Sequence, residues 1–236
     1  MALKKKLNFL WTLVLYLIAS RLPKAFGKDL PRVPTITDPK FIDAFLNIHN
    51  ELRRKVQPPA ADMNQLFWDQ QLAKLAKAWT RECKLAHNPC IKQRYECLDD
   101  YDFIGENIYL GRIETQPEDV VINWYNESKY FNFDFNTCSE MCGHYTQVVW
   151  AKTVKIGCAV SNCPNLKGFS AGLFVCNYSP AGNFIGFRPY TRGDSCSMCG
   201  QKTCENSLCR PMNRKTPHHK AACHVLVLGF ILQSLL

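Results

Sequence analysis

Cysteine is the residue that most constrains how this chain folds. The 236 residues include 13 cysteines, and 12 of them lie between Cys83 and Cys209. The secretory pathway oxidises such a set of thiols, whereas the cytosol keeps them reduced, so we expect a disulfide framework. Zinc is the competing interpretation of the sequence CSMC at 196–199. No second CxxC motif follows it, and a small disulfide-linked extension fits this spacing better.

The N-terminus is typical of a secretory signal. The segment MALKKK is basic, LNFLWTLVLYLIA is apolar, and AFG at 25–27 offers small residues for cleavage after Gly27. The apolar run is shorter than the roughly 20 residues that a membrane-spanning helix needs. Residues 1–27 carry five basic residues and no acidic one, so cleavage lowers the formal charge from +9 to +4. We therefore expect no nucleic-acid partner.

The C-terminus, residues 210–236, pairs a polar spacer with a terminal apolar segment, ACHVLVLGFILQSLL. This pattern predicts a signal for a glycosylphosphatidylinositol (GPI) anchor, attached between Ser207 and Thr216, with Asn213 as one small attachment candidate. The odd cysteine, Cys223, then falls in the discarded tail. The alternative is a retained hydrophobic end, with Cys223 free or paired between chains.

The middle of the chain predicts helices first and strands later. Asp38 and Pro39 form a cap and first turn, and apolar spacing predicts a helix over 39–56. QPPA at 57–60 ends it. A second helix follows, with one face made of Leu72, Leu75, Trp79 and Cys83.

A third helix is expected from Thr115, because TQPE at 115–118 reads as a capping box, with Val121, Trp124 and Tyr125 on its buried side. VKIGCAV at 154–160 and GLFVCNY at 172–178 read as strands, each with a central cysteine.

Four polar residues interrupt apolar surroundings: His87, Glu106, Glu127 and His144. His87 follows the second helix, Glu106 lies in a strand-like segment, and Glu127 is expected on the third helix. Two histidines and two carboxylates suit a metal site with supporting acids, or an acid and base pair. The spacing does not show that the four side chains converge. A structural cluster of hydrogen-bonded His and Glu under a loop is therefore an equally good interpretation.

Four segments together resemble the signature motifs of the CAP superfamily, named for cysteine-rich secretory proteins, antigen 5 and pathogenesis-related proteins. They are HNELR at 49–53, GENI at 105–108, GHYTQVVW at 143–150 and FVCNYSPAGN at 174–183. The resemblance covers about residues 38–190, the CAP domain, and is greatest to the glioma pathogenesis-related-like branch. It implies an α+β fold, a three-layer α-β-α sandwich, followed by a short cysteine-rich extension at 191–209.

The resemblance also assigns residues. It implies a cleft formed by His87, Glu106, Glu127 and His144, in which His87 and His144 hold a divalent metal such as zinc weakly. His49 is expected in the core instead. No catalytic residue is assigned, although Glu106 and Glu127 are the candidate acids.

Disulfides follow partly from the same resemblance. It implies Cys83–Cys163, Cys158–Cys176, Cys196–Cys204 and Cys199–Cys209, while Ile104 and Ser179 stand where secreted relatives have a further pair. The four remaining cysteines are assigned to the local pairs Cys90–Cys97 and Cys138–Cys142. Of two glycosylation sequons, only Asn126 is expected to be used, because the one at 177–179 lies in a buried strand.

Three function classes remain. The favoured one is a recognition protein on the outer face of the membrane, whose partners are extracellular or cell-surface proteins. The resemblance implies gamete binding on sperm as its setting. The alternatives are a hydrolase that uses metal-bound water with Glu106 or Glu127 as base, and a sterol or lipid carrier covered by the aromatic segment 130–135. The first is favoured because no serine or cysteine nucleophile stands in a recognisable motif.

Overall fold

The computed structural model describes residues 33–212. The signal segment and the tail from residue 213 onward lie outside this range. The helices are α2 (Pro39–Arg54), α3 (Gln70–Arg81), α4 (Pro117–Tyr125) and α5 (Gly143–Val148), with 3-10 turns η1 (Pro89–Lys92) and η2 (Asn126–Tyr130). Within residues 33–212, no helix is both long enough and apolar enough to cross a membrane.

The strands form one central sheet and two small hairpins. The sheet has the order β1-β5-β6-β2, from β1 (Phe67–Trp68), β5 (Lys155–Leu166), β6 (Phe169–Ser179) and β2 (Gly105–Gly111). The hairpins pair β3 (Phe131–Asn132) with β4 (Thr137–Cys138) and β7 (Thr203–Glu205) with β8 (Leu208–Arg210). All pairings are antiparallel except that of β1 with β5.

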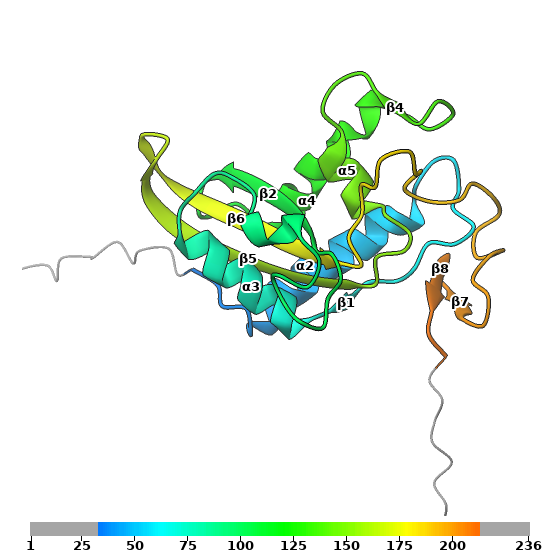
Figure 1. Cartoon of the computed structure of the whole chain (residues 1–236), viewed down its shortest axis with the longest axis horizontal. Helices are drawn as coiled ribbons and strands as arrows, with labels where there is room; N and C mark the ends of the chain where they lie inside the picture. Colours follow the sequence, from blue (N-terminus) through cyan, green and yellow to red (C-terminus); the bar gives the residue numbers. More distant parts are fainter. Residues whose placement is uncertain (1–32, 213–236) are drawn as a thin grey trace, which may run out of the picture.

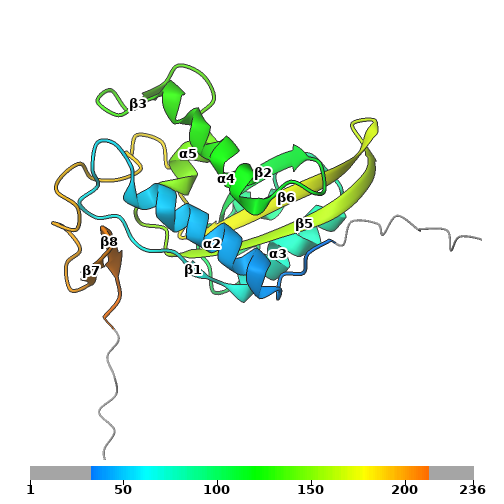
Figure 2. The same cartoon turned by 180° about the vertical axis from the view of Figure 1, so that it is seen from behind.

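Helices cover both faces of the sheet, so the expected α-β-α sandwich is confirmed. Helix α3 lies on one face (Figure 1), and α2 and α4 lie on the other (Figure 2). Alternation along the strands explains both layers. Ile156 and Val160 of β5 belong to the main core under α2 and α4, whereas Ala159 packs with Ala76 of α3.

Helix α3 approaches the sheet unusually closely at Gly157. A Cβ atom at this position would lie 2.1 Å from the backbone nitrogen of Ala73. The side of α3 that meets the sheet is correspondingly small, with Leu72, Ala73, Ala76 and Thr80 buried. The expected face is thus partly wrong: Leu75 and Trp79 are only partly buried, and Cys83 lies beyond the helix end, with a φ of 51°.

The first and third helices differ in how well their starts are predicted. Helix α2 begins as expected, because Asp38 accepts a hydrogen bond from the backbone N–H of Lys40 and Pro39 occupies the first turn. The capping box expected at Thr115 is wrong. Helix α4 is capped at Gln116, whose side chain makes no capping bond and donates instead to the carbonyl of Glu114.

Three polar side chains on α2 are buried, those of His49, Asn50 and Arg53, and each forms hydrogen bonds. Asn50 both donates to the carbonyl and accepts from the N–H of Leu66, at 3.0 and 2.8 Å. Arg53 donates to five backbone carbonyls, those of Asn64, Val148, Trp150, Ala151 and Thr153. This helix therefore fixes the loops on either side of it by polar bonds rather than by packing alone.

His49 is a core residue, as expected. Its Nδ1 lies 2.7 Å from the carbonyl of Phe45 and its Nε2 lies 2.9 Å from the hydroxyl of Tyr178. Burial lowers the pKa of His49 to about 3, so the ring stays neutral and takes no part in a solvent-facing site.

Six disulfides join the twelve described cysteines in the pairs given above. Cys158–Cys176 links directly opposed residues of β5 and β6, and both are fully buried. Cys83–Cys163 ties the end of α3 to β5. The strand register continued by one residue places Ile104 opposite Ser179, where both are buried without a disulfide.

The cysteine-rich extension packs against the sandwich. The backbone N–H of Cys209 donates to the carbonyl of Met63, and that of Gln65 donates to Cys209. Leu208 is 2 % exposed and belongs to the main core. The extension is therefore a continuation of the domain, held to the loop after α2.

We predict that Arg53→Met destabilises the protein by at least about 3 kcal/mol, because it leaves buried carbonyls without donors. Urea unfolding of the secreted protein measures this change. Arg54→Met is the matched control, since Arg54 forms only a partly exposed pair with Glu51, worth at most about 1 kcal/mol. Equal loss of stability in both variants would contradict the assigned role of Arg53.

Candidate functional site

The first histidine–glutamate pair joins the loop after α3 to β2. Nδ1 of His87 lies 2.9 Å from Oε1 of Glu106, and the same oxygen accepts the backbone N–H of Asn88 at 3.0 Å. The side chain of Glu106 is fully buried, while that of His87 is 54 % exposed. Oε2 of Glu106 is buried and has no partner among the described residues.

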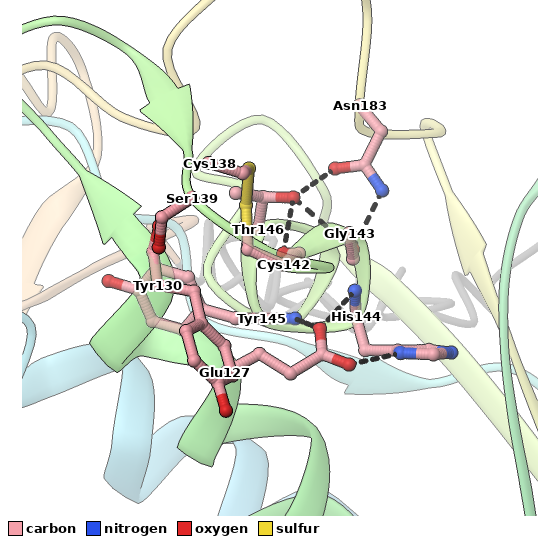
Figure 3. The surroundings of a disulfide bond; sticks show 10 residues. All are labelled: Glu127, Tyr130, Cys138, Ser139, Cys142, Gly143, His144, Tyr145, Thr146 and Asn183. Carbon is pink, nitrogen blue, oxygen red and sulfur yellow. Dashed lines mark hydrogen bonds and ion pairs between the residues drawn. A yellow bond between two sulfur atoms is a disulfide. The ribbon is translucent and has the colours of Figure 1, made fainter.

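The second pair lies at the start of α5 (Figure 3). Oε1 of Glu127 accepts from Nδ1 of His144 at 2.6 Å, and Oε2 accepts the backbone N–H groups of His144 and Tyr145 at 2.9 and 3.3 Å. Glu127 lies on η2 rather than on the third helix, which corrects the expectation. Because one carboxylate binds both the helix start and the ring, the orientation of His144 follows that of α5.

Strand β2 brings the two pairs together. Asn107, next to Glu106, donates through Nδ2 to the carbonyl of His144 at 3.0 Å. Gln147, one helical turn after His144, lines a hollow of about 320 Å³ together with His87 and Glu106. His87 and Glu106 line this hollow directly, whereas His144 is connected to it through Asn107 and Gln147. We call the hollow and the two histidine–glutamate pairs beside it the cleft.

A larger hollow of about 560 Å³ lies elsewhere. Phe133, Trp150 and Tyr190 line it with several charged side chains, and none of the four cleft residues does. We place the chemistry at the smaller cleft because titratable groups converge there, whereas volume alone identifies no reaction.

The ring bonds determine which histidine atoms can bind a ligand. A carboxylate accepts a hydrogen bond, so Nδ1 carries the proton in both rings and Nε2 holds the lone pair. Such a histidine–carboxylate arrangement is the one that supports metal binding through Nε2. Each ring thus has one nitrogen suited to a divalent metal, although no three of the four residues bring ligand atoms within 4.8 Å of one another.

Cysteines offer no competing metal centre. Cys196, Cys199 and Cys209 form the one group of three or more potential ligands within residues 33–212, with their sulfur atoms within 4.8 Å of one another. Each is oxidised in a disulfide. A metal requires the thiolate, so this cluster is structural.

Other polar residues of the cleft were not singled out from the sequence. Gln147 accepts the N–H of Gly182 at 2.9 Å, and Asn183 accepts from the hydroxyl of Thr146 at 2.7 Å and donates to the carbonyl of Gly143. All of these residues lie inside the segments 143–150 and 174–183. Their place in two of the CAP signature motifs is the sequence feature that could have identified them. Asn126, the expected glycosylation site, is exposed, whereas Asn177 is fully buried.

Comparison with known proteins agrees with this geometry. The signature of the CAP family, described as the cysteine-rich secretory protein family, matches residues 46–178. The chain belongs to the CAP family. It is 50% identical over 212 residues to human GLIPR1-like protein 1, which covers 89% of this chain and 84% of that protein. It is 44% identical over 179 residues to mouse glioma pathogenesis-related protein 1, which covers 75% and 67%.

Solved CAP structures share the fold. BmVAL-1 has a TM-score of 0.62 at 26% identity and covers 77% of this chain and 99% of its own. NaASP2 with Zn²⁺ has a TM-score of 0.57 at 27% identity and covers 72% and 95%. These neighbours support the sandwich, and the second was solved with zinc.

We predict that Glu106→Gln lowers the pKa of His87. The hydrogen bond that His87 donates to Glu106 raises this pKa above 6.5, against the opposing effect of burial. The stabilisation from this bond is therefore present below pH 6.5 and is lost as pH rises through the pKa of folded His87. NMR titration of the His87 ring protons measures this pKa. Asp102→Asn, which alters an exposed pair with Arg94, is the control, and an unchanged pKa in Glu106→Gln would refute the coupling.

Proposed function

We propose that this CAP protein is a cell-surface recognition protein, secreted and held on the outer leaflet by a GPI anchor. It acts by contact with extracellular or cell-surface proteins, and its likeness to the glioma pathogenesis-related branch supports sperm–egg binding as the setting. The anchor signal lies outside the described residues and rests on the sequence pattern. What the described part contributes is a stiff, disulfide-bonded domain that carries an open cleft.

The hydrogen bonding of the two cleft histidines is the observation that favours recognition. Within residues 33–212, the ring nitrogens of His87 and His144 bond to glutamate and to no serine, threonine or cysteine. A nucleophile activated by a base requires such a bond. The cleft thus presents fixed ligand-binding groups without an aligned protein nucleophile.

Metal binding belongs to the same proposal. Nε2 of His87 and Nε2 of His144 would hold a divalent cation such as zinc, with Glu106 and Glu127 orienting the rings. Two nitrogens leave coordination positions for a partner's carboxylate or for water, so binding is weaker than in a closed structural site. When bound, the metal supplies a Lewis acid at the cleft.

Zinc titration tests the metal site. We expect His87→Ala with His144→Ala to weaken binding at least tenfold, and Glu127→Gln to weaken it about 10- to 100-fold through loss of ring orientation. Calorimetry on residues 28–212 avoids the tail histidines, and this part contains all six disulfides and the whole core. Glu114→Gln, an exposed acid paired only with Arg112, is the control. Equal zinc binding by wild type and double variant would remove these histidines from any metal role.

One observation favours a hydrolase as the second candidate. Oε2 of Glu106 is a buried carboxylate oxygen beside His87 with no partner among the described residues, and a general base supplies such a group. The sterol carrier has less support, because Phe131 and Phe133 pack against the core. Of the phenylalanines in the segment 130–135, only Phe135 is largely exposed, at 77%.

Treatment of intact cells with a phosphatidylinositol-specific phospholipase tests the anchor. Release of a product without Cys223 is expected, and a retained chain that still carries residues 224–236 would rule the anchor out. The released protein is then used to capture partners from sperm and egg surfaces, beside a hydrolase screen with and without zinc. Capture without turnover supports recognition, whereas zinc-dependent turnover that is lost in Glu106→Gln would replace it with hydrolysis.

A further inference from the structure

An apolar turn projects from the surface between β6 and the extension. Ile185 is 100% exposed, Phe187 is 64% exposed and Phe184 is 46% exposed. Single exposed apolar residues are ordinary, but three within four residues are a patch that marks an interaction site. Phe184 also lines the cleft, whereas Ile185 and Phe187 do not.

The backbone of this turn is internally bonded. The N–H of Phe187 donates to the carbonyl of Phe184 at 3.1 Å, and Gly186 between them has a φ of +83°. This is a β-turn with glycine at the position that takes positive φ, and Ile185 stands at its outer corner. Because the N–H of Phe187 and the carbonyl of Phe184 are bonded to each other, moving them from water into an apolar environment costs less free energy.

The base of the turn is anchored. The ring of Phe184 lies 6.2 Å from the rings of both Phe103 and Trp150. On the other side, Arg188 donates to the carbonyls of Phe133 and Asp134 at 3.0 and 2.7 Å. Ile185 and Phe187 are therefore presented by a fixed scaffold, which lowers the ordering cost of binding.

Basic side chains accompany the turn. Arg188 and Lys152 border the larger hollow with Phe187, and both are exposed. Of the two acidic neighbours, Asp134 pairs with Arg192, whereas Asp62 accepts only from the N–H and hydroxyl of Thr191 and keeps its charge. Three cations, Lys152, Arg188 and Arg192, thus face two carboxylates, and the surface beside the apolar tip carries a net charge of +1.

We propose that this turn contacts a phospholipid surface, with Ile185 and Phe187 in the interfacial region and Lys152 and Arg188 on lipid phosphates. A convex apolar tip with cations behind it fits a deformable bilayer surface, whereas a protein partner would need a matching cavity. The contact is independent of a lipid anchor, because all of these residues precede residue 213.

Vesicle flotation of residues 28–212 tests the proposal. We expect binding to vesicles of phosphatidylcholine with phosphatidylserine, weaker binding to phosphatidylcholine alone, and at least tenfold weaker binding of Ile185→Ser with Phe187→Ser. Phe169→Ser is the matched control, since Phe169 is 47% exposed but starts β6 on the β5–β6 hairpin. Equal binding by the double variant and wild type would overturn the proposal.

A gain-of-signal variant guards against misfolding. On addition of vesicles, the tryptophan fluorescence of Ile185→Trp is expected to shift to shorter wavelength and to be quenched by brominated lipids. The fluorescence of Phe169→Trp is expected to show neither change. Sedimentation velocity separates the other occupants of this surface. Self-association that disappears in Ile185→Ser with Phe187→Ser, without vesicle binding by wild type, would assign the turn to a second copy of the chain instead.

Discussion

The bonds of Arg53 hold together the part of the structure on which the cleft depends. One buried guanidinium on α2 donates to the carbonyl of Asn64 and to four carbonyls between residues 148 and 153. Burial lowers the pKa of Arg53 to about 9, which still leaves it charged at neutral pH. All of its hydrogen-bond acceptors are backbone carbonyls, each of which has to be in place, and Asp62 adds a favourable charge interaction. The end of α5, and with it His144, is thereby fixed to α2.

The individual helices and strands were predictable from local patterns, whereas their arrangement as a sandwich was implied by the resemblance. Asp38 and Pro39 start α2 by local bonds, and the strands 154–160 and 172–178 carry their pattern within a few residues. Those features act over short distances, and the structure retains them. The capping box at Thr115 failed because a local match does not ensure the bond, and the buried face of α3 shifted because the close approach at Gly157 selects small side chains.

The site was predictable in membership but not in geometry. His87 and Glu106 are 19 residues apart, and Glu127 and His144 are 17 apart, so neither periodicity nor spacing could pair them. His87 meets Glu106 because the loop after α3 lies beside β2, and Glu127 meets His144 because η2 lies beside α5. The bond of Asn107 to His144 then joins β2 to α5. Resemblance supplied the four residues. Only the structure shows that Nδ1 is engaged in each ring and that Oε2 of Glu106 has no partner within residues 33–212.

The position of Cys158–Cys176 also bears on the order of events during maturation. Both sulfur atoms lie in the closed core between β5, β6 and the helices above them. Thiol–disulfide exchange requires access to a sulfur atom, so this bond has to form before the helices α2 and α4 settle on the sheet. An oxidase can reach the two cysteines while the β5–β6 hairpin is still open, whereas a reductant cannot reach the disulfide once the helices cover it. The finished protein can therefore pass through reducing surroundings with this link preserved, while its surface disulfides remain open to exchange.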